Sequence, residues 1–163
     1  MAFLRDAPIP IVSIAGFPFG VDPASTKAAA AARVVEDGAS EVDIVVNLGA
    51  LKSGDLSAVG ADVAAVRAAI PGKVLKVILE TGLLSVEEAR LAARVCRDSG
   101  ADFLKTCTGY GPRGATVEDV ELLREFGPVK ASAGIRSFEQ AAALVAAGAG
   151  RLGTSATKSI LSC

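Results

Sequence analysis

The chain has 163 residues, 51% of them apolar, and its 17 basic side chains nearly balance its 18 acidic ones. This balance argues against a nucleic-acid partner and against a polybasic membrane-binding surface. The sequence has no histidine, which excludes His-based triads and most zinc sites. It has no tryptophan and one tyrosine, so it offers few aromatic platforms for stacking bases.

The cysteines and the hydropathy pattern predict the compartment. Cys96, Cys107 and Cys163 are widely spaced without a C-x-x-C pattern, as is typical of a reduced protein. The first residues lack the apolar core of a signal peptide, and no apolar run is long enough to span a membrane. No linker or low-complexity stretch divides the chain. We therefore expect a cytoplasmic protein with a single domain over residues 1–163.

Apolar, strand-like runs alternate with Ala-rich helical ones along the chain. We predict strands at 11–16, 41–47, 74–80, 102–107, 128–132 and 151–154, and helices near 23–37, 56–70, 86–99, 117–126 and 138–147. Helix starts carry capping signals, namely Ser85 with Glu88, Ser137 with Gln140, and Thr116. Gly-Ala pairs at 38–39, 100–101 and 148–149 end three helices. Such alternation with short loops predicts parallel strands joined by right-handed crossovers.

Polar residues within the strands decide between two α/β architectures. Asp43, Lys76 and Lys105 each lie in mid-strand. In a doubly wound sheet helices cover both faces, and charges in mid-strand would be buried beneath them. The lumen of a (β/α) barrel can hold polar groups at its C-terminal mouth. The sequence therefore favours a barrel of the TIM type.

Two lysines on consecutive predicted strands point to a chemistry. Lys105 lies in 102–107 and Lys130 in 128–132. A buried ammonium group must be paired or its pKa must fall, and two neighbouring ammonium groups lower each other's pKa. A neutral lysine amine attacks carbonyl carbons. The pair therefore predicts Schiff-base chemistry.

Ordered motifs between about residue 10 and about residue 157 resemble one family. They are G-F-P-F-G (16–20), E-V-D (41–43), G-A-L-K-S-G (49–54), L-K-V-I-L-E-T (75–81), A-D-F-L-K-T (101–106), K-A-S (130–132) and R-L-G-T-S (151–155). By these motifs the chain resembles the 2-deoxyribose-5-phosphate aldolases, which are class I aldolases on a TIM barrel. Two further βα units precede the G-F-P strand in that family. The resemblance therefore implies six of the eight units here.

The resemblance also implies roles for individual residues. Lys105 matches the Schiff-base lysine, and Lys130 matches a second lysine that tunes it. Asp43 matches the aspartate of a proton relay, and Lys76 matches a further lysine of the pocket. The positions that match the phosphate site are Gly109, Gly134, Ile135, Arg136, Gly153 and Ser155. The chain departs from the family pattern at Ala133, where glycine is usual, and at Ala156, where serine is common.

Structural roles are the alternative for several of these residues. Lys105 could be a lysine that snorkels at a strand end. Lys130 could form a buried ion pair with Asp43 or Glu80, and Asp43 could serve only to neutralise lumen lysines. The glycines could be ordinary turn residues. For Cys107 we expect the role of a small core residue.

The implied reaction is the reversible cleavage of 2-deoxy-D-ribose 5-phosphate to D-glyceraldehyde 3-phosphate and acetaldehyde, with no metal or external cofactor. We expect these small molecules as partners, no nucleic-acid or membrane partner, and a homo-oligomer that covers the outer strands of an incomplete barrel. The alternatives are a Schiff-base aldolase for another sugar phosphate, a weakly active or non-catalytic barrel that binds sugar phosphates, and a fragment whose missing strands come from another chain.

Overall fold

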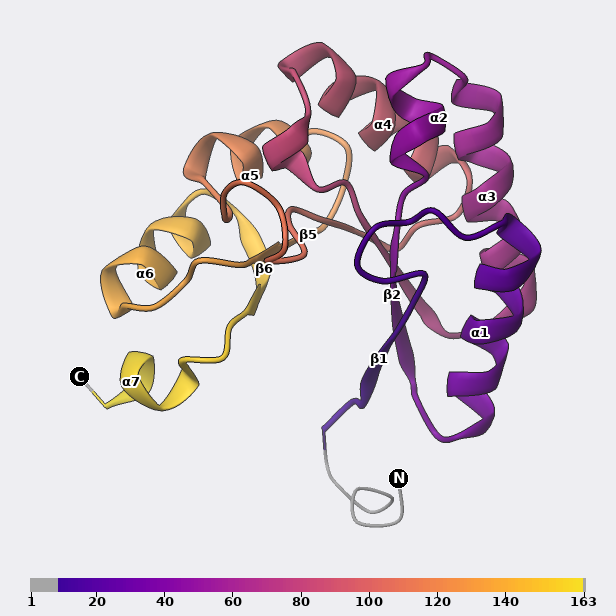
Figure 1. Ribbon diagram of the computed structural model, residues 1–163. Helices are drawn as coiled ribbons and strands as arrows, with labels where there is room; N and C mark the ends of the chain where they lie inside the picture. Colours follow the sequence, from indigo (N-terminus) through magenta and orange to yellow (C-terminus); the bar gives the residue numbers. More distant parts are fainter. Residues whose placement is uncertain (1–8, 163) are drawn as a thin grey trace.

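The computed structural model describes residues 9–162, which form one six-stranded parallel sheet with helices on its convex side (Figure 1). The strands are β1 (Val12–Ala15), β2 (Glu41–Val45), β3 (Val74–Ile78), β4 (Phe103–Lys105), β5 (Val129–Ser132) and β6 (Ala149–Gly153). Each strand pairs with the next one in the chain, which is the strand order of a (β/α) barrel. The six strands make a half-barrel, as predicted. The predictions about the N-terminal segment and Cys163 concern residues outside this range.

Within residues 9–162, five longer helices follow the predicted pattern, and three short ones were not predicted. The longer helices are α1 (Ala24–Glu36), α3 (Leu56–Ala69), α4 (Val86–Asp98), α5 (Val117–Leu123) and α6 (Phe138–Ala146). The short ones are α2 (Leu48–Lys52), the 3₁₀ helix η2 (Thr81–Leu83) and α7 (Thr157–Leu161). Segments of one turn are too short to show a helical hydrophobic period, so the sequence pattern could not reveal them.

Local capping fixes where the longer helices begin and end. Capping boxes join Ser85 to Glu88, Thr116 to Asp119 and Ser137 to Gln140. The glycines predicted to end three helices, Gly38, Gly100 and Gly148, have φ angles of 109°, 103° and 111°. A side chain at such positive φ is disfavoured, so glycine lets each helix turn directly into the next strand. These caps are confirmed.

Strand side chains alternate between two environments. Those on the convex side are apolar and buried against the helices, among them Val42, Ile44, Leu75, Val77 and Leu104. Those on the concave side include the charged residues Glu41, Asp43, Lys76, Lys105, Lys130 and Arg151. The pleat therefore separates an apolar core from a charged lumen, which is the division that favoured a barrel.

A buried ion pair lies outside the lumen. Lys27 of α1 is fully buried, its Nζ lies 2.6 Å from Asp62 of α3, and it donates to the carbonyl of Val45 at 2.9 Å. A Cβ added at Gly16 would lie 2.9 Å from the Lys27 side chain, so the G-F-P motif begins with glycine for packing. The ion pair ties two helices to the end of β2, the strand that carries the site carboxylates.

Candidate active site

Asp43 is the centre of the charged lumen. Its side chain projects from β2 and is 1% exposed. The Nζ atoms of Lys105 on β4 and Lys130 on β5 each lie 2.8 Å from its Oδ2. The Nζ of Lys76 on β3 lies 3.0 Å from its Oδ1. Curvature of the sheet lets three strands deliver ammonium groups to one carboxylate.

Glu41 forms a second carboxylate centre two residues earlier on the same strand. Its Oε2 lies 2.6 Å from the Nζ of Lys76 and 2.5 Å from Nη1 of Arg151 on β6. The guanidinium of Arg151 also lies 5.1 Å from the centroid of the Phe103 ring, in a cation–π contact. Lys76, which is fully buried, therefore bridges the two carboxylates.

Burial and neighbouring charges shift the pKa values of this cluster. Burial alone would raise the pKa of Asp43, but Lys105 and Lys130 more than offset it and hold that pKa at about 2. Burial lowers the pKa of Lys130; Asp43 opposes this, while the charges of Lys105 and Lys76 add to it. Four cationic side chains face two carboxylates here. A neutral amine or a bound anion would relieve this excess of positive charge.

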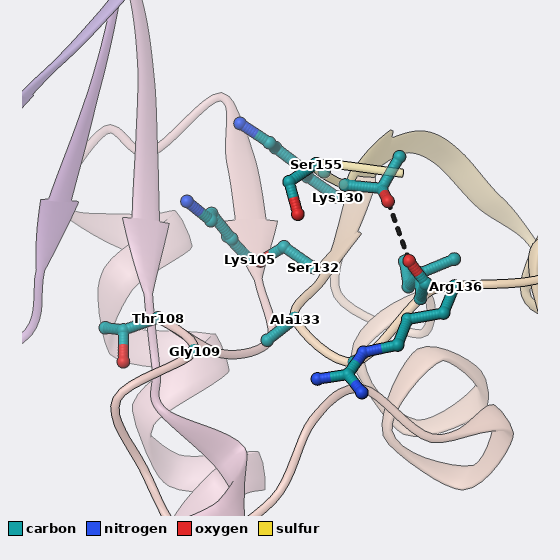
Figure 2. A pocket seen from close by; sticks show the side chains of 12 residues that line it. Lys105, Thr108, Gly109, Lys130, Ser132, Ala133, Arg136 and Ser155 are labelled. Carbon is teal, nitrogen blue, oxygen red and sulfur yellow. Dashed lines mark hydrogen bonds between the residues drawn. The ribbon is translucent and has the colours of Figure 1, made fainter. Parts of the chain in front are cut away.

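A pocket of about 450 Å³ opens at the C-terminal ends of β4, β5 and β6. It is lined by Lys105, Thr108, Gly109, Lys130, Ser132, Ala133, Gly134, Ile135, Arg136, Gly153, Thr154 and Ser155. Figure 2 shows the two lysine side chains extending in the same direction, with Arg136 at the opposite side of the view. All six residues predicted for the phosphate site line this pocket. Asp43 and Lys76 are not among the lining residues, and Asp43 reaches the pocket through its contacts with the two lysines.

The pocket wall is built from tight turns. Ala133 and Gly134 have φ angles of 76° and 77°, so two consecutive residues are left-handed after β5. A Cβ at Gly114 would lie 2.5 Å from the carbonyl oxygen of Ala133, so the loop before α5 packs closely on this turn. The hydroxyl of Thr154 donates to the carbonyl of Ile135 at 2.7 Å, which joins the loops after β5 and β6.

Glu80 supports the loop that follows Lys105. It is 3% exposed and left-handed, with a φ of 47°. Its Oε2 accepts hydrogen bonds from the amide of Thr108, at 3.3 Å, and from the hydroxyl of the same residue.

Of the two ion-pair partners considered for Lys130, Asp43 and Glu80, the structure shows Asp43. Cys107 is fully buried, and burial raises the pKa of its thiol, which fits the expected core role.

Metal sites and membrane-spanning helices are both absent from residues 9–162. Within that range no three His, Cys, Asp or Glu side chains come together as a set that could hold a metal ion. None of the helices formed by those residues is long and apolar enough to cross a membrane.

The sequence of residues 14–162 matches the DeoC/LacD family of aldolases. The chain belongs to this family. The deoxyribose-phosphate aldolase of Brevibacillus brevis is 47% identical over 162 residues, which are 97% of this chain and 73% of that protein. The deoxyribose-phosphate aldolase of one Thermus thermophilus strain is 54% identical over 154 residues, 91% of this chain and 70% of that protein.

Solved structures of aldolases share the fold. An aldolase named QR15 superposes with a TM-score of 0.90 and 42% identity, covering 93% of this chain and 71% of that one. The deoxyribose phosphate aldolase of Aeropyrum pernix, described as a unique tetramer, gives a TM-score of 0.87 at 34% identity, covering 98% of this chain and 70% of that one. The fold expectation of a TIM-type half-barrel is confirmed by these neighbours.

The sequence motifs predicted no role for two residues of the lumen, Glu41 and Arg151. Glu41 lies two residues before Asp43, so the alternation of a strand already places both on one face. Arg151 opens the R-L-G-T-S motif. The signal was present in both cases, but a contact across the lumen between β2 and β6 cannot be inferred from strand order alone.

Proposed function

We propose that the chain catalyses the reversible cleavage of 2-deoxy-D-ribose 5-phosphate to D-glyceraldehyde 3-phosphate and acetaldehyde, through an imine on Lys105. The observation that carries the proposal is the pair of amines of Lys105 and Lys130, which share Asp43 Oδ2 at 2.8 Å and line one pocket. The close relatives named deoxyribose-phosphate aldolase support this substrate.

The opposite wall of the pocket suits a phosphate. The turn through Ala133 and Gly134 is left-handed at both residues, and such turns gather backbone N–H groups into concavities that bind anions. Arg136 lines the same pocket and can donate from a guanidinium. The proposed phosphate ligands are the backbone and side chains of Gly109, Gly134, Ile135, Arg136, Gly153 and Ser155. Binding there would orient the aldehyde end of the sugar toward the lysines.

The chemistry needs one nucleophile and several proton transfers. The Lys105 amine attacks C1 of the open-chain sugar, and loss of water gives a protonated imine. Removal of the proton from the C3 hydroxyl allows the C2–C3 bond to break. The electron pair moves through C1 to the imine nitrogen, which leaves an enamine and glyceraldehyde 3-phosphate. Protonation of C2 and hydrolysis of the imine release acetaldehyde and restore the amine.

The lumen residues would carry the protons. Asp43 is ionised at neutral pH, because its pKa is about 2, and it contacts both pocket lysines. Lys130 has a lowered pKa and can therefore exchange a proton closer to neutrality than an exposed lysine. Lys76 holds the other oxygen of Asp43 at 3.0 Å and would fix the orientation of that carboxylate. In this scheme Lys130 also tunes Lys105 by its charge.

A coupled assay tests the proposal. Reduction of the released acetaldehyde by an NADH-dependent alcohol dehydrogenase would report cleavage of 2-deoxy-D-ribose 5-phosphate. We expect turnover by the unaltered chain, loss of at least about 1,000-fold in Lys105→Met, and no loss in Lys158→Arg, a control at an exposed lysine. Failure of the unaltered chain to release acetaldehyde, or full turnover by Lys105→Met, would contradict the proposal.

Assembly and compartment complete the proposal. Among the described strands β1 and β6 are the sheet edges, and Val12 and Ile14 on β1 are 39% and 47% exposed. Open strand edges with apolar side chains favour pairing with another chain, and we propose a homo-oligomer. The thiols of Cys96 and Cys107 are free, which supports a reducing compartment such as the cytoplasm.

A further inference from the structure

Three buried or half-buried charged residues of the lumen are not among the residues that line the pocket. Glu41, Lys76 and Arg151 do not line the pocket, yet they form a continuous line of ion pairs that ends at Asp43. Glu41 is 3% exposed and Lys76 is fully buried. Burying charged groups is energetically costly, so we expect these three residues to have a role in the lumen.

The line crosses the concave side of the sheet. β2 and β6 are not neighbours in the strand order, yet Arg151 on β6 reaches Glu41 on β2 at 2.5 Å. The contact with the Phe103 ring, 5.1 Å from its centroid to the guanidinium carbon, holds Arg151 from a second side. Arg151 is therefore fixed between an aromatic face and a carboxylate, and it competes with Lys76 for one Glu41 oxygen.

Lys76 transmits the state of Glu41 to Asp43. Its Nζ forms an ion pair with Glu41 Oε2 at 2.6 Å and donates a hydrogen bond to Asp43 Oδ1 at 3.0 Å. With Oδ1 engaged, only Oδ2 is left to face Lys105 and Lys130. The charge of Lys76 is also one of the causes that lower the pKa of Lys130. How far Glu41 neutralises Lys76 should therefore affect both the orientation of Asp43 and the protonation of Lys130.

We infer that Glu41 and Arg151 are positioning residues that act through Lys76 to set the orientation of Asp43 and the protonation of Lys130. Glu41 places a negative charge beside the buried Lys76 ammonium group, and Arg151 draws part of that charge away. Opposite changes at these two positions should therefore have opposite effects on Lys130. The consequence for turnover rests on the proposed aldolase function, but the effect on protonation does not.

The charged groups around Lys130 define the sign of each effect. They are Asp43 on β2, Lys76 on β3, Lys105 on β4 and Arg151 on β6, which pairs in register with Lys130, with Glu41 beyond Lys76. The other buried carboxylate near the strand ends, Glu80, is engaged by Thr108. Glu41→Gln removes a negative charge, which disfavours protonated Lys130. Arg151→Gln removes a positive charge, which favours it. The double variant restores the original charge sum.

Competitive labelling with acetic anhydride measures the protonation of Lys130 and does not require any turnover. The pH midpoint for acetylation of Lys130, read by peptide mass spectrometry, should fall by about half a pH unit in Glu41→Gln and rise by about half a unit in Arg151→Gln. In the double variant the midpoint should return close to that of the unaltered chain. The acid limb of the aldolase rate–pH profile should move in the same directions.

A matched control uses the exposed ion pair of Arg90 and Glu125, whose atoms lie 2.6 Å apart on the outer surface. Arg90→Gln and Glu125→Gln should leave the Lys130 midpoint unchanged. If Glu41→Gln does not fold, Arg151→Gln remains as a test, because the Arg151 side chain is 37% exposed. Equal midpoints in all variants, or shifts of the same sign in both single variants, would overturn the inference. Opposite shifts without acetaldehyde release would support it while the proposed function fails.

Discussion

Replacing Asp43 by asparagine should be the most damaging single change in the lumen. The ammonium groups hold the pKa of Asp43 at about 2, roughly two units below that of an ordinary aspartate. Each unit is worth about 1.4 kcal/mol, so ionised Asp43 favours the folded state by roughly 2–3 kcal/mol at neutral pH. The substitution also leaves three ammonium groups without this counter-charge. We expect a loss of about 3–5 kcal/mol in the free energy of unfolding.

Urea unfolding at pH 7, followed by circular dichroism, would measure this loss. Adding Lys130→Met to Asp43→Asn removes one of the ammonium groups that lost their counter-charge. The double variant should therefore recover about 1–2 kcal/mol of the lost free energy of unfolding. Asp37→Asn is the control, because Asp37 pairs with Arg33 on the surface, where both side chains are about half exposed or more; it should change stability by less than about 0.5 kcal/mol. Asp43→Asn with the stability of the unaltered chain would refute the reasoning about the lumen.

The charge of Asp43 also makes the free energy of unfolding depend on pH. Because the pKa of Asp43 is lower in the folded state, its stabilising effect is complete above about pH 4 and is lost as the pH falls toward about 2. The urea midpoints of Asp43→Asn and the unaltered chain should therefore converge over that pH range. Lys130→Leu should move the acid limb of the rate–pH profile to higher pH, because it removes the positive charge that shares Asp43 Oδ2 with the nucleophile; an unchanged profile at full activity would mean that Lys130 is structural. Lys27→Met should cost about 3 kcal/mol in urea unfolding, because it leaves Asp62 buried without its partner. Ala133→Gly should stabilise the chain by about 0.5 kcal/mol, because the residue has a φ of 76°; a lower urea midpoint would show that this turn is not strained.

The half-barrel and the pocket could be predicted because they depend on local rules. Periodicity located every strand, and the pleat placed Asp43, Lys76 and Lys105 on one face. The pairing of Lys105 with Lys130 across β4 and β5 follows from consecutive strands in a parallel sheet. The turns after β4, β5 and β6 meet at one end of the sheet, so the residues predicted for the phosphate site line one pocket.

Contacts that depend on sheet curvature could not be predicted. Lys130 meets Asp43 although 87 positions separate them, and no sequence pattern distinguished Asp43 from Glu80 as its partner. The inward direction of Lys27 was also hidden, since α1 is so rich in alanine that no face of the helix stands out. The left-handed backbone of Glu80 is likewise a property of the folded loop, because glutamate has no preference for that conformation.

Borohydride trapping tests the central proposal most directly. Incubation with acetaldehyde followed by reduction converts an imine into a stable N-ethyl lysine, which peptide mass spectrometry can locate. We predict one N-ethyl group per chain on Lys105, no adduct in Lys105→Met, and an unchanged yield in Lys158→Arg. An adduct on Lys130 or on any other lysine, with Lys105 unmodified, would contradict the assignment of the nucleophile.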